Sequence, residues 1–212
     1  MSDSNNGWWS RLWKRPNSKW LLGIPLGGFI AVAVGAVGLG AMDYTLHATS
    51  TTEFCFACHS HEQFIKPEYE ASSHFSNSSG VRAECKDCHL PHGFFELAVK
   101  KMIVSQDIIP ELMGKIDTQE KYEANRAHMA EKAWREFKST DSKYCRSCHV
   151  VEAMDAEQQG RSVSRRHAMM AERGQTCIDC HAGIVHKLPE NHTDILDRIN
   201  AELAGEAGSE KE

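Results

Sequence analysis

Every cysteine of this 212-residue chain belongs to one of four copies of the pattern Cys-x-x-Cys-His. The four copies are Cys55, Cys58 and His59; Cys85, Cys88 and His89; Cys145, Cys148 and His149; and Cys177, Cys180 and His181. Two thiols at this spacing can add to the two vinyl groups of one porphyrin, while the adjacent histidine reaches the iron. The pattern therefore predicts four covalently attached haem c groups.

Paired cysteines also occur in structural zinc sites, dithiol redox switches and the disulfide frameworks of exported proteins. None of these three explains a histidine directly after every second cysteine. Haem also explains how a chain with 8% aromatic and 25% charged residues can fold. Four porphyrins would supply much of the core, and we expect the polypeptide alone to bury little.

A run of 23 uncharged residues, 20–42, lies near the N-terminus and is long enough to cross a bilayer. Basic residues precede the run and acidic residues are the first charges after it: Arg11, Lys14, Arg15, Lys19, then Asp43 and Glu53. This asymmetry predicts a single-pass anchor in the inner membrane, with a cytoplasmic N-terminus and periplasmic haem motifs. A cleaved signal peptide is the alternative, but the apolar run exceeds a usual signal-peptide core.

The region after the anchor repeats itself. The first two motifs begin 30 residues apart, the last two begin 32 apart, and the two pairs are separated by 90 residues. Each pair is therefore interpreted as one half of a duplicated dihaem module. The predicted organisation is a cytoplasmic tail at 1–19, an anchor at 20–42, dihaem halves at 43–115 and 116–192, and a flexible tail at 193–212.

Four further histidines occupy corresponding places in the two halves. His74 and His167 lie between the motifs of their pairs, and His92 and His186 follow the second motif. A neutral imidazole binds haem iron well, so these four are the predicted sixth ligands. Three histidines without a counterpart are expected to be surface residues: His47, His128 and His192.

Strand-like alternation is nearly absent, whereas residues 94–113 and 118–138 have helical periodicity. Thr118 stands where the cap of the second helix is expected. The predicted fold is mainly α, with long irregular haem-binding loops. The formal net charge of -5 argues against nucleic acid as a partner.

The anchor, the motif positions and several segments resemble the NapC/NirT family of membrane-anchored tetrahaem quinol dehydrogenases. The segments are GVRAECKDCHLPHG, KKMIVSQDI, KIDTQEKYEANR, DSKYCRSCH and GQTCIDCHAGIVHKLP. The likeness extends from the anchor to about Glu190. KIDTQEKYEANR and AWREFK are most similar to the branch linked to periplasmic nitrate reductase.

This resemblance implies that a membrane quinol, menaquinol or ubiquinol, is oxidised near the first haem. The electrons would then pass to a periplasmic reductase, with the nitrate reductase complex as the expected partner. In related cytochromes, a lysine and an aspartate seven residues apart border the first haem, and Lys100 and Asp107 match that spacing. Asp107 is the expected proton acceptor, with Lys100 or Lys101 positioning the quinol. Without the resemblance, all three would be interpreted as solvated helix charges.

The chain departs from the family at the first haem, where many members have Cys-x-x-Cys-His-x-Met. His61 stands at the methionine position. Either His59 binds the iron in the usual way, which we favour, or His61 replaces the methionine.

A second function fits the same motifs. The protein could be a tethered electron relay or reductase anchor subunit, in nitrite, sulfoxide or amine-oxide respiration, without a quinol site. That function requires four haems with saturated iron ligation, whereas quinol oxidation requires a labile or vacant site near the membrane.

Overall fold

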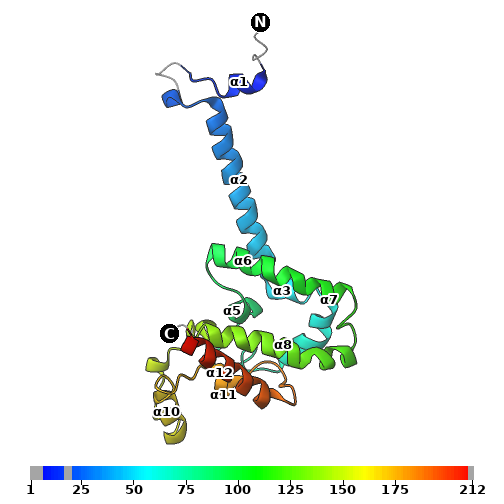
Figure 1. Ribbon diagram of the computed structural model, residues 1–212, viewed down its shortest axis with the longest axis vertical. Helices are drawn as coiled ribbons and strands as arrows, with labels where there is room; N and C mark the ends of the chain where they lie inside the picture. The colour runs from blue at the N-terminus through cyan, green and yellow to red at the C-terminus, as the bar shows by residue number, and fades with distance from the viewer. Residues whose placement is uncertain (1–6, 17–20, 210–212) are drawn as a thin grey trace. The chain divides into compact units, whose positions relative to one another are not determined.

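The computed structural model describes residues 7–16 and 21–209, and these ranges contain helices but no β-strand. The prediction of a mainly α protein is confirmed. The chain divides into two compact units, Met1–Thr49 and Ser50–Glu212 (Figure 1).

The first unit contains the apolar helix. Its elements are α1 (Trp8–Leu12), the 3₁₀ turn η1 (Leu21–Gly23) and α2 (Leu26–Ala48). The 23-residue α2 has a mean hydropathy of 1.7 and is almost entirely exposed, as a bilayer-spanning helix would be.

The helix is shifted from the predicted span of 20–42. Pro25 caps it, because a proline lacks an amide hydrogen and its fixed φ suits the start of a helix. At the other end, α2 continues through Asp43 to Ala48. Lys19 and Trp20, which we assigned to the tail and the anchor, lie outside the described residues.

The second unit consists mostly of short helices joined by long loops, together with two long helices, the central α8 and the C-terminal α12. Its elements are α3 (Thr52–Cys55), the π-helical turn η2 (His61–Ile65), α4 (Lys66–Glu70), α5 (Cys85–His89), α6 (Phe94–Val104), η3 (Ser105–Asp107), α7 (Ile108–Leu112), α8 (Gln119–Ser139), α9 (Lys143–Arg146), η4 (Val151–Ala153), α10 (Arg161–Ala168), α11 (Ile178–His181) and α12 (His192–Ser209). Each Cys-x-x-Cys-His motif begins within one of these short helices or directly before it.

The structure divides the first of the two predicted helices and confirms the second. Residues 94–113 form three consecutive pieces, α6, η3 and α7, because Pro110 has no amide hydrogen to continue a regular helix through the preceding turn. The second helix is confirmed: α8 begins after Thr118, whose side-chain oxygen accepts a hydrogen bond from the Lys121 amide at 3.3 Å.

A small apolar cluster attaches the C-terminal helix to the rest of the unit. Ile195 and Ile199 of α12 are almost completely buried, with 1% and 0% exposure, beside Trp134 of α8 and Ile178 of α11. Figure 1 shows α12 alongside α8 and α11. Residues 193–209, for which we expected a flexible tail, are helical, and the apolar face of this helix packs against α8 and α11. Residues 210–212 lie outside the described ranges.

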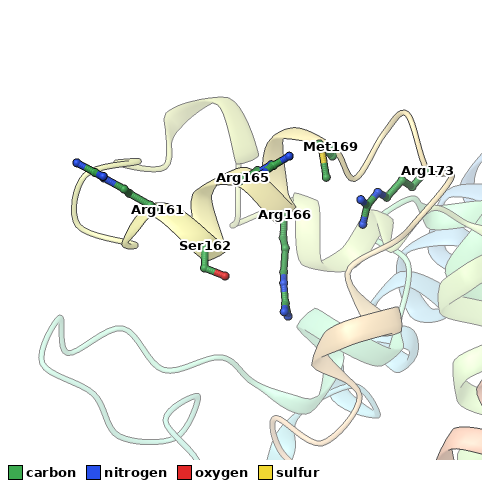
Figure 2. Close-up of a pocket in the computed structure, with 6 residues that line it drawn as sticks. All are labelled: Arg161, Ser162, Arg165, Arg166, Met169 and Arg173. Atoms are coloured by element: carbon green, nitrogen blue, oxygen red, sulfur yellow. The ribbon is translucent and has the colours of Figure 1, made fainter.

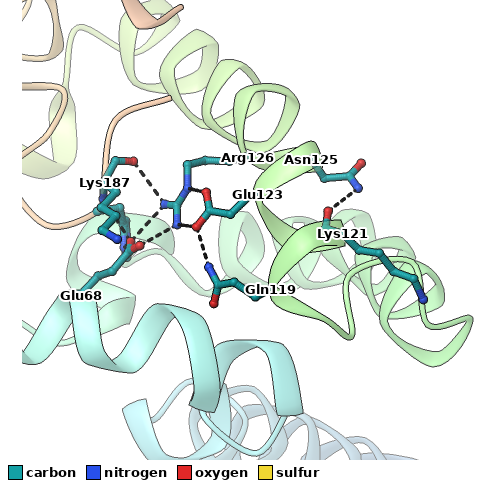
Figure 3. A network of polar contacts seen from close by, with 8 residues as sticks. Glu68, Gln119, Lys121, Glu123, Asn125, Arg126 and Lys187 are labelled. Atoms are coloured by element: carbon teal, nitrogen blue, oxygen red, sulfur yellow. Dashed lines mark hydrogen bonds and ion pairs between the residues drawn. The ribbon is translucent and has the colours of Figure 1, made fainter. Parts of the chain in front are cut away.

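An ion-pair network crosses the predicted boundary between the dihaem halves (Figure 3). Arg126 of α8 donates two hydrogen bonds to Glu68 of α4, at 2.6 and 3.2 Å, and two to Glu123, at 2.6 and 2.9 Å. The Lys187 amide also donates to Glu68 at 3.1 Å. The side chains of Arg126 and Glu68 are only 8% and 11% exposed. Residues 50–209 thus pack as one unit, and the duplication itself stays a prediction.

Burial by itself raises the pKa of Glu68. The contacts of His186, Arg126 and the Lys187 amide outweigh burial and lower the pKa to about 2, from an ordinary value of 4.5. A carboxyl whose pKa falls on folding stabilises the folded state above its unfolded-state pKa. The contribution of Glu68 is therefore present above about pH 4.5 and is lost as the pH falls toward 2.

We predict that Ile199→Ala lowers the free energy of unfolding of the holoprotein by about 2–5 kcal/mol, because it leaves a cavity between α12 and α8. Urea unfolding followed by far-ultraviolet circular dichroism measures this. The control is Ile184→Ala, because Ile184 is 44% exposed, and its expected change is within about 0.5 kcal/mol. Equal effects of the two substitutions would contradict the packing of α12.

We also predict that Glu68→Gln lowers the free energy of unfolding by about 2–3 kcal/mol near neutral pH, because Arg126 loses a charged, hydrogen-bonded partner. The difference from wild type should shrink as the pH falls below 4.5, as urea titrations at several pH values would show. Glu202→Gln is the control, since Glu202 forms a more exposed ion pair with Arg135. A loss that does not depend on pH would argue against an ionised Glu68.

Candidate functional site

The four Cys-x-x-Cys-His motifs are neighbours in space in the same order as in the sequence. The Cys55 thiol lies against the Cys85 thiol, and Cys145 lies against Cys177. Cys88 approaches Cys145, which brings the second and third motifs together through the contact of α5 with α9. The motifs therefore form a continuous series from the first to the fourth.

Aspartates fix the local backbone of the second and fourth motifs in the same way. Asp87 accepts a hydrogen bond from the Glu84 amide at 2.8 Å, and Asp179 accepts one from the Thr176 amide at 2.7 Å. Asp179 also forms a buried ion pair with Lys138 of α8 at 2.5 Å. Burial alone would raise the pKa of Asp179, but Lys138 and the Thr176 amide lower it.

Three motif histidines face a histidine from elsewhere in the chain. The ring centroids are 6.1 Å apart for His149 and His74, 6.3 Å for His89 and His186, and 6.2 Å for His181 and His167. A metal-imidazole bond is about 2 Å long, so two imidazoles on opposite sides of one metal ion have centroids roughly 6 Å apart. The residues present therefore fit haem iron with two histidine ligands at each of three motifs.

Two of these imidazoles, His89 and His74, are held in the neutral form that binds iron. Burial, followed by the proximity of His186, lowers the pKa of His89 to about 4. Burial and the proximity of His149 also lower the pKa of His74. The Nδ1 atom of His167 lies 2.9 Å from the side-chain oxygen of Gln159. If that nitrogen carries the ring proton, Nε2 keeps its lone pair and can bind iron.

Polar surroundings differ between the extra histidines. The Nδ1 atom of His186 lies 3.6 Å from the Glu68 carboxylate, too far for a hydrogen bond but within the range of charge attraction. The Nδ1 atoms of His74 and His186 are buried without a hydrogen-bond partner among the described residues. Packing, rather than a hydrogen bond at Nδ1, therefore holds both imidazoles.

The first motif is surrounded differently. His59 and His92 are exposed, and neither forms a histidine pair within the described ranges. His61 is partly buried, and burial is the main cause of its lowered pKa. It lies near His186, so it faces the second haem site as well as its own motif.

The three predicted quinol-site residues have separate surroundings. Lys100 forms an ion pair with Glu136 of α8 at 2.5 Å. Asp107 binds Lys132 of α8 through both carboxylate oxygens at 2.7 Å. Lys100 and Asp107 thus pair with different residues of α8 and not with each other.

Lys101 is the lysine beside the first motif. Its ammonium group lies 5.8 Å from the centre of the Phe54 ring, and Phe54 is the residue directly before Cys55. Burial lowers its pKa, and the proximity of Cys55 partly opposes this.

One carboxylate beside the first motif was missed by sequence reasoning. Glu111 of α7 accepts hydrogen bonds from the Ser60 amide at 3.0 Å and the Ser60 hydroxyl at 2.6 Å. Ser60 separates His59 from His61, so Glu111 fixes the backbone between the two candidate ligands. The only sequence signal was its place four residues after Asp107, one helical turn further on.

Comparison with known proteins gives the family. Residues 16–191 match the NapC/NirT cytochrome c family, N-terminal region. The cytochrome c-type protein NapC of Escherichia coli is 41% identical over 192 residues, which cover 89% of this chain and 94% of NapC. The denitrification system component NirT of Stutzerimonas stutzeri is 38% identical over 183 residues, covering 86% of this chain and 90% of NirT.

A third relative is longer. The cytochrome c-type protein TorY of Haemophilus influenzae is 46% identical over 167 residues, which cover 77% of this chain but 45% of TorY. The chain thus spans about half the length of this relative. No solved structure matches the chain. With four haem-attachment motifs, one apolar N-terminal helix and this similarity, the chain belongs to the NapC/NirT cytochrome c family and is a membrane-anchored multihaem electron-transfer cytochrome with covalently bound haem c.

Proposed function

We propose that this cytochrome oxidises quinol in the membrane and passes the electrons, one haem after another, to a periplasmic reductase. The observation that carries the proposal is the spatial order of the motifs, in which successive motifs lie close together: Cys55 with Cys85, Cys88 with Cys145, and Cys145 with Cys177. The haems, when bound, exchange one electron at a time. A linear series of such groups suits conduction from one end to the other.

The proposed iron ligands follow from the histidine pairs. His89 with His186, His149 with His74, and His181 with His167 serve the second, third and fourth haems. Of the predicted ligands, His59 and His92 are without a partner in these three pairs, and we assign them to the first haem, with His61 as a neighbouring residue that does not bind iron. Both proposed ligands of the first haem are exposed, so this pair is the one most open to displacement or to an approaching substrate.

We place quinol oxidation at the first motif. Cys55 follows the last residue of α2, Ala48, by seven positions, and seven residues span at most about 25 Å. The first haem is therefore tethered close to the membrane surface. The basic residues before α2 favour a cytoplasmic N-terminus and a periplasmic haem domain.

Three side chains have distinct roles in this proposal. Oxidation of a quinol releases two electrons to the haems and two protons to the surroundings. Lys101, beside Phe54 and Cys55, donates a hydrogen bond to a quinol oxygen. Asp107 accepts a proton and passes it to water, to which its side chain is 57% exposed. Lys100 has a structural role in this proposal, because its ion pair with Glu136 joins α6 to α8.

The acceptor is proposed from sequence similarity. The KIDTQEKYEANR segment, which contains the start of α8, favours periplasmic nitrate reductase. Nitrite, sulfoxide and amine-oxide reductases are the alternatives, and reoxidation of the reduced holoprotein by each purified reductase would separate them. A tethered relay without a quinol site is the rival function.

We predict that quinol analogues reduce the wild-type holoprotein in proteoliposomes rapidly, and that Asp107→Asn slows this reduction by about 100-fold because a proton acceptor is lost. Haem absorbance after stopped-flow mixing measures the rate. Glu202→Gln, which breaks a comparable exposed ion pair, should have wild-type kinetics. Failure of menaquinol and ubiquinol analogues to reduce the wild type would favour the relay.

Lys101→Met should slow the same reaction about tenfold, the effect of losing one hydrogen bond from a charged donor. Its matched control is Lys143→Met, because Lys143 also lies beside an aromatic ring, 5.2 Å from the centre of Tyr144. Similar rates for the two variants would rule out a specific role of Lys101.

His186→Met should change the ligand set of a single haem. We expect the electron paramagnetic resonance signal of one haem with two histidine ligands to disappear and the midpoint potential of that haem to rise, while all four haems remain covalently attached. His128→Ala on α8 is the control and should leave every signal unchanged. Four unaltered signals in His186→Met would contradict the proposed pairing.

A further inference from the structure

Four arginines form a basic patch beside the fourth haem site. Arg161, Arg165 and Arg166 belong to α10, and Arg173 follows it. Together with Ser162 and Met169 they line an open hollow, and Figure 2 shows the four guanidinium groups spread over the helix and the turn after it. Residues 160–174 contain one acidic residue, Glu172, whereas the whole chain has a net charge of -5.

These arginines differ from the other arginines of the second unit. Each of the others donates hydrogen bonds to a carbonyl oxygen or a carboxylate: Arg82, Arg126, Arg135, Arg146 and Arg198. Within the described part of the chain, none of the four patch guanidinium groups has a hydrogen bond or ion pair. All four are exposed. Their charge is therefore available to a partner outside the chain.

The position of the patch connects it to the end of the haem series. Arg165 and Arg166 directly precede His167, whose ring faces the fourth-motif histidine His181 at 6.2 Å. An electron acceptor that docks on α10 would thus approach the fourth haem. An opposite charge on that acceptor would attract it from a distance and raise the rate of encounter.

We propose that the arginine patch, Arg161, Arg165, Arg166 and Arg173, is the docking surface for an acidic face of the soluble protein that takes electrons from this cytochrome. The inference rests on the proposed order of electron transfer, with exit at the fourth haem. The haem propionates are the competing anions, because arginines next to a haem can pair with them.

The test uses the full-length holoprotein, reduced chemically, so that it depends neither on quinol oxidation nor on the native reductase. Two soluble electron acceptors serve as probes: an acidic blue-copper protein and a basic cytochrome c. Stopped-flow absorbance gives the second-order rate of electron transfer to each probe at low and high salt. The variant is Arg161→Gln/Arg165→Gln, and the control is Arg135→Gln/Arg198→Gln, which removes the same charge from α8 and α12.

We expect the patch variant to reduce the acidic probe about tenfold more slowly than wild type at low salt. The difference should vanish at high salt, and the rate to the basic probe should not fall. The control should remain within about twofold of wild type, because both of its arginines are already paired with carboxylates of the chain, Glu131 and Glu202.

Three results would overturn the proposal. Equal slowing in the control would assign the effect to net charge. No slowing in the patch variant would exclude the patch as a docking surface. Slowing that persists at high salt, together with a shifted haem absorbance or midpoint potential, would assign the arginines to the haem propionates.

Discussion

Attachment of haem to the four Cys-x-x-Cys-His motifs is the constraint on which the rest of the second unit depends. Among the described residues, the apolar cluster centred on Trp134, Ile195 and Ile199 is small. The longest loops and shortest helices surround the motifs. Two of the three histidine pairs join distant parts of the sequence: His74 and His149 are 75 positions apart, and His89 and His186 are 97 apart. Porphyrins bound between these pairs would connect segments that have few direct contacts of their own.

Charged contacts provide the second set of connections, and they converge on α8. Arg126 binds Glu68, Lys132 binds Asp107, Glu136 binds Lys100, and Lys138 binds Asp179. The central helix thus contacts segments around several motifs. Asp107, the proposed proton acceptor, takes part in one of these contacts, so a substitution there removes an ion pair with α8 as well as a carboxylate.

The sequence was most informative where the chemistry requires an invariable spacing. Haem attachment depends on Cys-x-x-Cys-His, and the apolar length of α2 depends on the bilayer, so both were predictable from the sequence alone. Internal repetition selected His74, His92, His167 and His186. Three of them now face motif histidines, whereas His92 is exposed and has no histidine pair among the described residues. The ion-pair partners could not be predicted, because Glu136, Lys132 and Glu111 meet their partners only through tertiary packing. The C-terminal helix was missed because its polar end concealed Ile195 and Ile199, whose burial depends on α8.

The central claim is that three haems have two firmly held histidine ligands, while the first haem is exposed and accepts electrons from quinol. Electron paramagnetic resonance of the oxidised wild-type holoprotein, with and without a saturating redox-inactive quinol analogue, tests this most directly. We predict three signals of haems with two histidine ligands that the analogue does not change, and a fourth signal that it shifts. Four identical signals, all unaffected by the analogue, would contradict the account and favour a tethered electron relay.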